Sequence, residues 1–156
     1  MTYWQKLFLS TLLIGSFAQA SENDDQTLIT RAALDYIESQ HQVDVAMMDR
    51  ALHPKLVKRT FWHDKEGQEF VMETSKEVML RVAASYNKNG DRFPTEPTKK
   101  VEILALDGRI AMVKLTADEW LDYMQLFKND AGQWQIVNVV WQYHDLSRHQ
   151  SGAAKK

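Results

Sequence analysis

The sequence predicts one α+β domain in which helices come first and an antiparallel sheet follows. Apolar residues between positions 28 and 52 recur at steps of three and four, which is the helical period. Residues 101–143 instead form short runs rich in β-branched and aromatic side chains, which are typical of strands. Asp107-Gly108 and the segment 129–133 with its glycine are turn signals between those runs. A chain of 156 residues is long enough for one core of ordinary size.

The first twenty residues are predicted to be a secretory signal peptide. Lys6 supplies an early positive charge, residues 7–17 form an apolar run, and Ala18-Gln19-Ala20 has the small residues of a cleavage site. The apolar run is shorter than the roughly 20 residues that a membrane-spanning helix needs. We therefore expect cleavage after Ala20, no membrane contact after leader removal, and a periplasmic or secreted protein.

Two helices are predicted at the start of the remaining chain. Residues 25–40 place apolar side chains on one face, and Asp24 or Asp25 can cap that helix. Residues 44–52 form a second, shorter helix that ends at His53-Pro54, because proline disfavours a helical conformation in the residue before it.

A strand pair and a third helix come next. Residues 56–63 and 69–73 flank a polar segment with a glycine, which favours a hairpin-like connection. Thr74 followed by Glu77 fits a capping box, and the apolar stripe after it predicts a helix that ends near Ser85. The proline-containing stretch 88–100 is predicted to be a loop.

The final strands are expected to form an antiparallel meander. They are predicted at residues 101–106, 110–116, 121–128 and 134–143. We expect the domain to span residues 21–143, because residues 144–156 are polar and unpatterned and are typical of a flexible tail.

The last predicted strand is apolar on both faces. Strict alternation groups Trp134, Ile136 and Val140 on one side, and Val137, Val139 and Trp141 on the other. One sheet face covers the helices, so the other needs a second cover. We expect that cover to be a second copy of the chain in a homodimer through the outer sheet face, and alternation does not decide which set faces outward.

Two parts of the sequence resemble a known family. They are residues 51–59, Ala-Leu-His-Pro-Lys-Leu-Val-Lys-Arg, and residues 122–126 followed by 132–141. Together with the order of elements they are similar to the nuclear transport factor 2-like superfamily, in the bacterial branch named "putative lumazine-binding". The resemblance spans about residues 28–143 and implies a cone in which a curved antiparallel sheet wraps around three helices. The superfamily includes isomerases, dehydratases and ligand-binding or scaffolding modules, so the resemblance implies no single function.

Asp49 and His53 are the candidate catalytic pair. The two residues are four positions apart, so on a helix the Asp49 carboxylate can accept a hydrogen bond from the His53 imidazole and set its tautomer. This arrangement is typical of a histidine that acts as a general base. The alternative is that His53 caps the helix end while Asp49 is solvated. Tyr36 and Asn138 can converge on the same interior if the cone forms, or serve as ordinary core groups.

Aromatic and methionine side chains provide flat, adaptable surfaces for a ring-shaped ligand. The candidate ligand-binding residues are Tyr36, Met48, Tyr123, Asn138 and Trp141. Asp122 is either an acid held among aromatic rings or a strand residue that faces solvent. No cofactor and no metal are expected, because the chain has no cysteine and its histidines match no recognised metal spacing.

These observations favour an exported protein that binds a small apolar or aromatic ligand. An alternative is a dehydratase- or isomerase-type enzyme that uses His53 and Asp49 for proton transfer, and a second is a structural or interaction module. The net charge of −2 argues against nucleic acid as a partner, because binding to a polyanion relies on clustered lysine and arginine.

Overall fold

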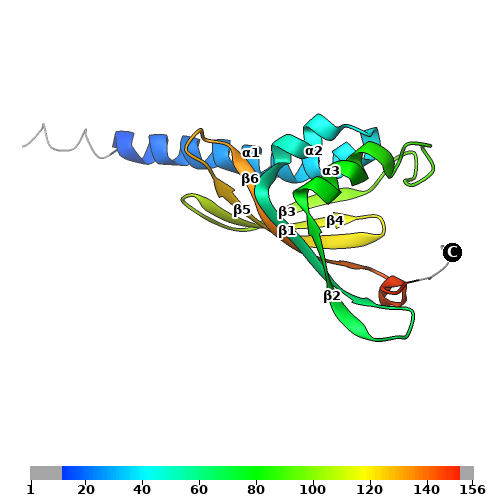
Figure 1. Ribbon diagram of the computed structural model, residues 1–156. Coiled ribbons are helices and arrows are strands. Elements are labelled where there is room, and N and C mark those ends of the chain that lie inside the picture. The colour runs from blue at the N-terminus through cyan, green and yellow to red at the C-terminus, as the bar shows by residue number, and fades with distance from the viewer. Residues whose placement is uncertain (1–11, 152–156) are drawn as a thin grey trace, which may run out of the picture.

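The computed structural model describes residues 12–151, with side chains described from residue 22 onward. Figure 1 shows three helices packed against one face of a curved sheet. The helices are α1 (Leu12–Gln42), α2 (Val45–Ala51) and α3 (Lys76–Ser85), followed near the C-terminus by the short 3-10 helix η1 (Leu146–Arg148). The strands are β1 (Leu52–His63), β2 (Glu69–Ser75), β3 (Lys99–Asp107), β4 (Ile110–Ala117), β5 (Trp120–Lys128) and β6 (Trp134–Tyr143).

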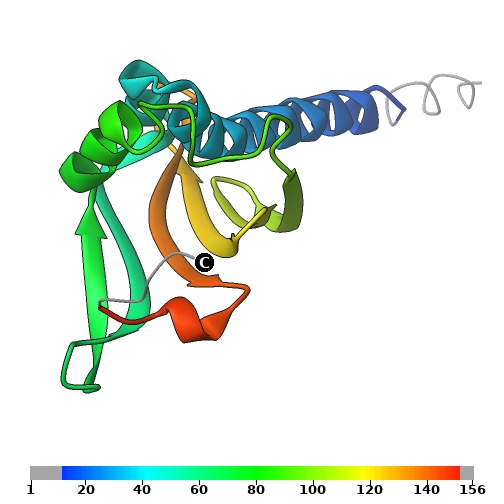
Figure 2. The same ribbon diagram turned by 90° about the vertical axis from the view of Figure 1, so that its right-hand side faces the viewer.

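The six strands form one unclosed sheet in the order β2-β1-β6-β5-β4-β3. The meander from β3 to β6 is antiparallel, as predicted, and β1 pairs with β2 in the predicted hairpin. The β1–β6 pair is parallel, so the sheet is mixed and not wholly antiparallel. The turned view in Figure 2 shows the strands curving beneath the helices, which confirms the α+β class and the curved sheet.

Helix α1 is longer than the sequence predicts. It begins at Leu12 rather than near residue 25, and its buried face includes Ile29, Ala33, Tyr36 and Ile37. Residues 1–11 of the predicted leader lie outside the described residues, whereas residues 12–20 form the first turns of α1. Within the described chain, no helix has the length and apolar character needed to cross a membrane.

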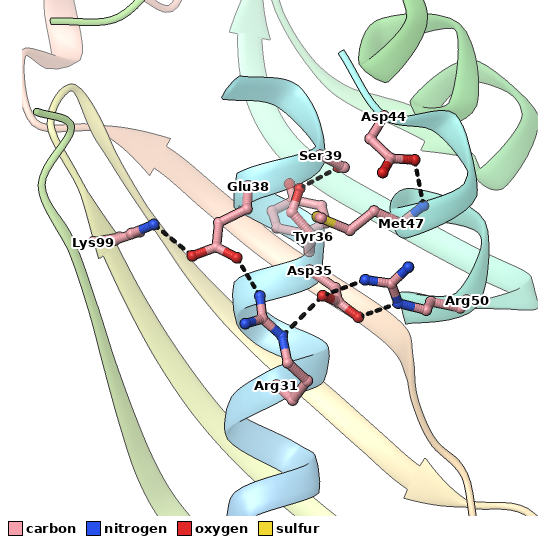
Figure 3. Close-up of polar contacts among 9 residues, drawn as sticks. All are labelled: Arg31, Asp35, Tyr36, Glu38, Ser39, Asp44, Met47, Arg50 and Lys99. Carbon is pink, nitrogen blue, oxygen red and sulfur yellow. Dashed lines mark hydrogen bonds and ion pairs between the residues drawn. The ribbon is translucent and has the colours of Figure 1, made fainter. Parts of the chain in front are cut away.

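Charged side chains fix α1 against its neighbours, as Figure 3 shows. Asp35 accepts two hydrogen bonds from Arg50 of α2, at 2.6 and 2.9 Å, and such two-pronged pairs hold a defined geometry. Glu38 forms an ion pair with Lys99 of β3. Both carboxylates lie within two residues of Tyr36, so these pairs set the rotation of the helical turn that carries this tyrosine.

Strand β1 follows α2 without a loop and starts four residues earlier than predicted. Its pairing with β6 shifts between Leu52, opposite Ile136, and Val57, opposite Asn138, so residues 53–56 form an irregular stretch of strand. Pro54 is exposed in this stretch, where the lost backbone donor is tolerated.

Helix α3 begins one residue later than its capping box predicts. Ser75, not Thr74, is the N-cap, and its hydroxyl accepts a hydrogen bond from the Val78 backbone N–H. Thr74 pairs with Lys58 and Ser75 pairs with Val57 across the β1–β2 hairpin, so Ser75 is the last strand residue before the helix.

Strand β6 contains a β-bulge at Val137. Leu126 of β5 pairs with Ile136 and Gln125 pairs with Asn138, which leaves one extra residue in β6. The inward and outward sides exchange there, so the strict alternation expected along β6 is wrong. Trp134, Ile136 and Val139 are buried on the concave side, whereas Val140 is 53% exposed on the convex side.

The segment predicted to be a flexible tail is attached to the sheet up to Ser151. The Ser151 backbone N–H donates to the His63 carbonyl at 2.9 Å, and Gln150 forms a parallel bridge with His63. His149 is buried against β1 and β6. Its contacts and the backbone hydrogen bonds, rather than a periodic apolar pattern, hold the segment in place. Residues 152–156 lie outside the described residues.

Candidate functional site

Three polar side chains meet at the centre of the concave face. Tyr36 comes from the buried face of α1. Lys58 faces inward from β1 because it alternates with less buried positions on either side, and Asp122 does so on β5. Strands β1 and β5 both pair with β6, which brings these distant residues together.

The three side chains form a buried ion pair with a hydroxyl bonded to both charges. The Lys58 ammonium donates to Asp122 Oδ1 at 2.9 Å and also to the Tyr36 hydroxyl. That hydroxyl donates in turn to Asp122 Oδ1 at 3.4 Å. Side-chain exposure is 10% for Lys58 and 0% for Asp122. Each buried charge is therefore compensated by the other.

Burial raises the pKa of Tyr36 well above its usual value of 10.0, and the negative charge of Asp122 raises it further. Both effects disfavour the phenolate, since an anion loses hydration on burial and is repelled by a nearby carboxylate. Tyr36 therefore remains a hydrogen-bond donor at neutral pH.

A cavity of about 200 Å³ lies beside Lys58, between α3 and the concave face of the sheet. Its lining includes Lys58, Met79, Tyr86, Trp120, Trp141 and Tyr143. The Lys58 ammonium lies 4.6 Å from the ring centroid of Trp141, within the range of a cation–π interaction. Aromatic rings thus form much of the wall around one cation.

Two hydrogen-bond donors in this wall are unused. In the part of the chain that the structure describes, the indole nitrogens of Trp120 and Trp141 are buried and have no hydrogen-bond partner. The second carboxylate oxygen of Asp122, Oδ2, is also buried without a partner there. Native proteins pair most buried polar groups with protein or with ordered water, so these three atoms lack, within residues 22–151, the partner that such groups usually have.

Comparisons with known proteins agree with this architecture. The model of the family described as "Putative lumazine-binding" matches residues 24–142. The chain belongs to this family. A comparison with curated proteins finds no match.

Solved structures extend the likeness to the NTF2-like fold. An NTF2-like protein of unknown function from Silicibacter pomeroyi is 17% identical, with 79% of this chain and 98% of that chain covered and a TM-score of 0.60. A second such protein, from Shewanella baltica, is 17% identical, with 78% and 94% covered and a TM-score of 0.58. A ketosteroid isomerase-like protein from Erwinia carotovora atroseptica is 14% identical, with 79% and 98% covered and a TM-score of 0.53. At these identities the likeness shows the fold alone.

Of the five candidate ligand-binding residues, the NTF2-like fold brings Tyr36 and Trp141 to the polar centre. Met48 is fully buried in the core and does not line the cavity. Tyr123 and Asn138 lie on the convex face, since the bulge in β6 turns Asn138 outward. There Asn138 accepts a hydrogen bond from Arg59 at 3.0 Å and donates to Gln125 at 3.2 Å.

Asp49 and His53 have separate partners. Asp49 is a mainly exposed carboxylate that pairs with Lys76 at 2.8 Å. His53 accepts a hydrogen bond through Nδ1 from the Lys55 backbone N–H at 3.0 Å, and its ring lies 4.8 Å from that of Phe127. The expected contact is not formed, because α2 ends before His53 and the helical four-residue spacing no longer applies. Proton transfer by these two residues stays a prediction.

Lys58 and Asp122 are the residues that sequence reasoning undervalued. The signal was present in the alternation, because Lys58 lies between Leu56 and Thr60, and Asp122 lies between Trp120 and Met124. A single charged residue on an apolar strand face most often lies at a sheet edge or faces solvent. The opposite charge that compensates Lys58 lies 64 positions away in the sequence. Among the described residues, no group of three or more His, Asp or Glu is placed to hold a metal.

Proposed function

We propose that the protein binds a small, uncharged, planar ring compound that carries a carbonyl or similar acceptor atom, in the concave cavity. The observation that carries this proposal is that Trp120 and Trp141 line the cavity while their buried indole N–H groups have no hydrogen-bond partner among the described residues. Both are donors, and the Lys58 ammonium beside them is another. An acceptor atom on the ligand satisfies groups that are otherwise costly to bury.

The charge balance of the site favours an uncharged ligand. Lys58 is already neutralised by Asp122 at 2.9 Å. A carboxylate or phosphate on the ligand adds a third buried charge without a counter-ion, which carries a large desolvation penalty. The aromatic lining and the volume of about 200 Å³ favour a flat molecule of one or two rings.

Isotope-edited NMR of the tryptophan indole N–H signals tests the proposal, with 2-acetylnaphthalene as the probe. The signals of Trp120 and Trp141 are expected to shift. Trp134 and Trp62 serve as internal controls, because their indole groups donate to Asp25 at 2.9 Å and to Ser151 at 3.2 Å. Substitution of each tryptophan by phenylalanine assigns the signals.

Two matched compounds test the ligand chemistry. 2-Ethylnaphthalene has no acceptor and is expected to bind at least about fivefold more weakly, the effect of one lost hydrogen bond of about 1 kcal/mol. 2-Naphthoate keeps acceptor atoms but adds a buried charge, so it is also expected to bind more weakly. Equal binding of all three compounds contradicts the proposed ligand class. Shifts confined to the control tryptophans, or no shift at all, contradict binding in this cavity.

A second candidate function is a dehydratase- or isomerase-type reaction in the same cavity. The observation that favours it is the buried set of Tyr36, Lys58 and Asp122, in which the Lys58 ammonium lines the cavity and contacts both other groups, and can stabilise negative charge on a carbonyl oxygen. NMR detection of deuterium uptake next to the carbonyl of 2-acetylnaphthalene in D₂O tests it. Uptake that depends on the protein and is lost in Tyr36→Phe supports catalysis, and an unaltered background rate contradicts it for this probe.

We further propose that two copies pair through the convex sheet face. This face exposes large apolar side chains on three neighbouring strands, namely Ile110 and Met112 of β4, Tyr123 of β5 and Val140 of β6. A groove of about 320 Å³ beside it is lined by residues that include Phe127 and Val137. Large apolar patches of this kind mark interaction sites, which also supports the structural or interaction module as an alternative role.

We propose that the protein acts outside the cytoplasm, in the periplasm or as a secreted protein. The proposal rests on the sequence of the predicted leader, residues 1–20.

A further inference from the structure

The C-terminal segment, residues 144–151, lies beyond the part of the chain that matches the family model, and it packs a buried histidine against the sheet. His149 is 1% exposed although its neighbours in the sequence are polar. It follows η1 and lies against the ends of β1 and β6. Figure 2 shows this segment beside the β1–β2 hairpin.

Its hydrogen bonds define which nitrogen of His149 carries the proton. Nε2 accepts the backbone N–H of Tyr143 at 2.8 Å and therefore has no proton. Nδ1 lies 3.0 Å from the Phe61 carbonyl and 3.3 Å from the Thr60 hydroxyl, so it is the donor. The neutral imidazole thus joins β6 to β1.

The same ring supports the wall of the cavity. It stacks on Phe61 with a centroid distance of 4.3 Å. Its centroid also lies 5.5 Å from Trp141 and 5.2 Å from Tyr143, two of the residues that line the cavity. Trp141 is therefore held between the Lys58 ammonium and His149.

We propose that His149 is a positioning residue for the cavity, and that its protonation releases the C-terminal segment and weakens ligand binding. A proton on Nε2 turns this atom from an acceptor into a donor that faces the Tyr143 N–H donor. The ring then has to leave its site, and Trp141 and Tyr143 lose a packing partner. The binding step rests on the proposed function, whereas the release of the segment does not.

The charges around His149 favour its neutral form. Burial lowers its pKa below the usual 6.5, and the nearby His63 and Arg148 lower the pKa further, against the opposing effect of the Phe61 carbonyl. The two carboxylates closest to these neighbours are engaged, Glu69 with His63 at 3.8 Å and Glu119 with Arg148 at 3.1 Å. The neutral imidazole is therefore the form present at neutral pH, and its protonation requires acidification.

The first experiment uses the free protein between pH 7.5 and 4. Hydrogen exchange of the Tyr143 amide, corrected for its intrinsic pH dependence, is expected to accelerate at least about tenfold on acidification. The Trp141 indole signal should move with the same midpoint. In His149→Gln and His149→Phe, which cannot titrate, both responses should be absent, whereas His63→Gln should keep them.

The result overturns the proposal if the wild type shows no response, if either His149 variant keeps the wild-type response, or if His63→Gln abolishes it. Two variants are used because phenylalanine keeps the ring packing and glutamine keeps hydrogen-bonding groups, so a folded one is available for the comparison.

The second experiment measures 2-acetylnaphthalene affinity at pH 7.5 and at a pH below the midpoint found in the first experiment. We expect at least about fivefold weaker binding by the wild type at the lower pH and no change in His149→Gln. Equal pH dependence of the two proteins overturns the link to the cavity. If the probe does not bind the wild type at pH 7.5, the proposed function fails, and the free-protein experiment alone decides the role of His149.

Discussion

Lys58 Nζ and Asp122 Oδ1 lie 2.9 Å apart at the centre of the concave face, and the hydroxyl of Tyr36 contacts both groups. In a surface ion pair, water solvates the remaining charge when one partner is lost. Here neither side chain is more than one-tenth exposed. The two charges are therefore interdependent, and their energetics should differ sharply from those of a surface pair.

Lys58→Met is expected to destabilise the protein by about 3–5 kcal/mol, because it leaves the Asp122 carboxylate buried without a counter-charge. Adding Asp122→Leu should recover most of this loss, since the second change removes the uncompensated charge. Urea denaturation of both single variants and the double variant measures the coupling. Simple additivity of the two changes contradicts the expectation.

Tyr36→Phe should cost about 1–3 kcal/mol, because the hydroxyl that accepts from Lys58 and donates to Asp122 is lost in a buried setting. Tyr123→Phe is the matched control, since Tyr123 is exposed on the convex face, and both changes are made in the Val140→Asp background so that the proposed interface does not contribute. The control should change stability by less than about 0.5 kcal/mol. Equal effects of the two changes in thermal or urea denaturation argue against the buried polar centre.

Asp25 should make the free energy of unfolding vary with pH in the acidic range. Hydrogen bonds from Lys128, and then from Trp134, hold its pKa below the usual 3.8. A lowered pKa in the folded state means that the stabilisation is fully present above about pH 3.8 and is lost as the pH falls through the folded-state value.

The variant Asp25→Asn should lose about 1.5–3 kcal/mol at neutral pH, the scale of a hydrogen bond to a charged group. Its stability should also vary less with pH below pH 4. Denaturation of wild type and variant from pH 7 to 3 tests this, with the exposed Asp24→Asn as control. Parallel curves for Asp25→Asn and wild type are the contrary outcome.

The protein is expected to sediment as a dimer at micromolar concentration, and Val140→Asp should convert it to monomers. Val140 is 53% exposed on the convex face, so the change places a charge in the proposed interface without disturbing the core. Leu146→Asp is the control, because Leu146 is similarly exposed but lies in η1. A monomeric wild type, or dissociation by the control alone, refutes the interface.

Expression with the complete leader should yield a protein that begins at Ser21. The cleavage site Ala18-Gln19-Ala20 and the apolar run before it are the reason. Intact-mass measurement of the periplasmic and extracellular fractions checks this, and a species that begins at Met1 in those fractions contradicts it.

The order of helices and strands was predictable because each depends on local patterns. The apolar face around Tyr36, the Asp-Gly turn and the glycine at 132 are each signals contained in a short stretch of sequence. The start of β1 was not predictable in this way. Pro54 indicated that a helix ends, but nothing local showed that a strand begins two residues before it.

The site was less predictable because it depends on contacts between distant positions. Lys58 and Asp122 meet only because two strands share β6 as a neighbour. His149 is buried by aromatic rings from β1 and β6, and a lone histidine in a polar stretch carries no periodic signal. For Asp49 and His53, the helical four-residue spacing was applied to a residue that lies beyond the end of α2 at Ala51.

The bulge at Val137 makes the site sensitive to the register of β6 more than to its composition. Deleting Val137 removes the bulge and keeps every later side chain on its present side, with Asn138 and Val140 outward and Trp141 inward. Regular pairing of Val137 with β5 instead shifts the later residues by one position, which turns Trp141 away from Lys58. A relative that is one residue shorter at this point can therefore keep the same inner surface, whereas one of equal length that lacks the bulge presents a different inner surface to a ligand.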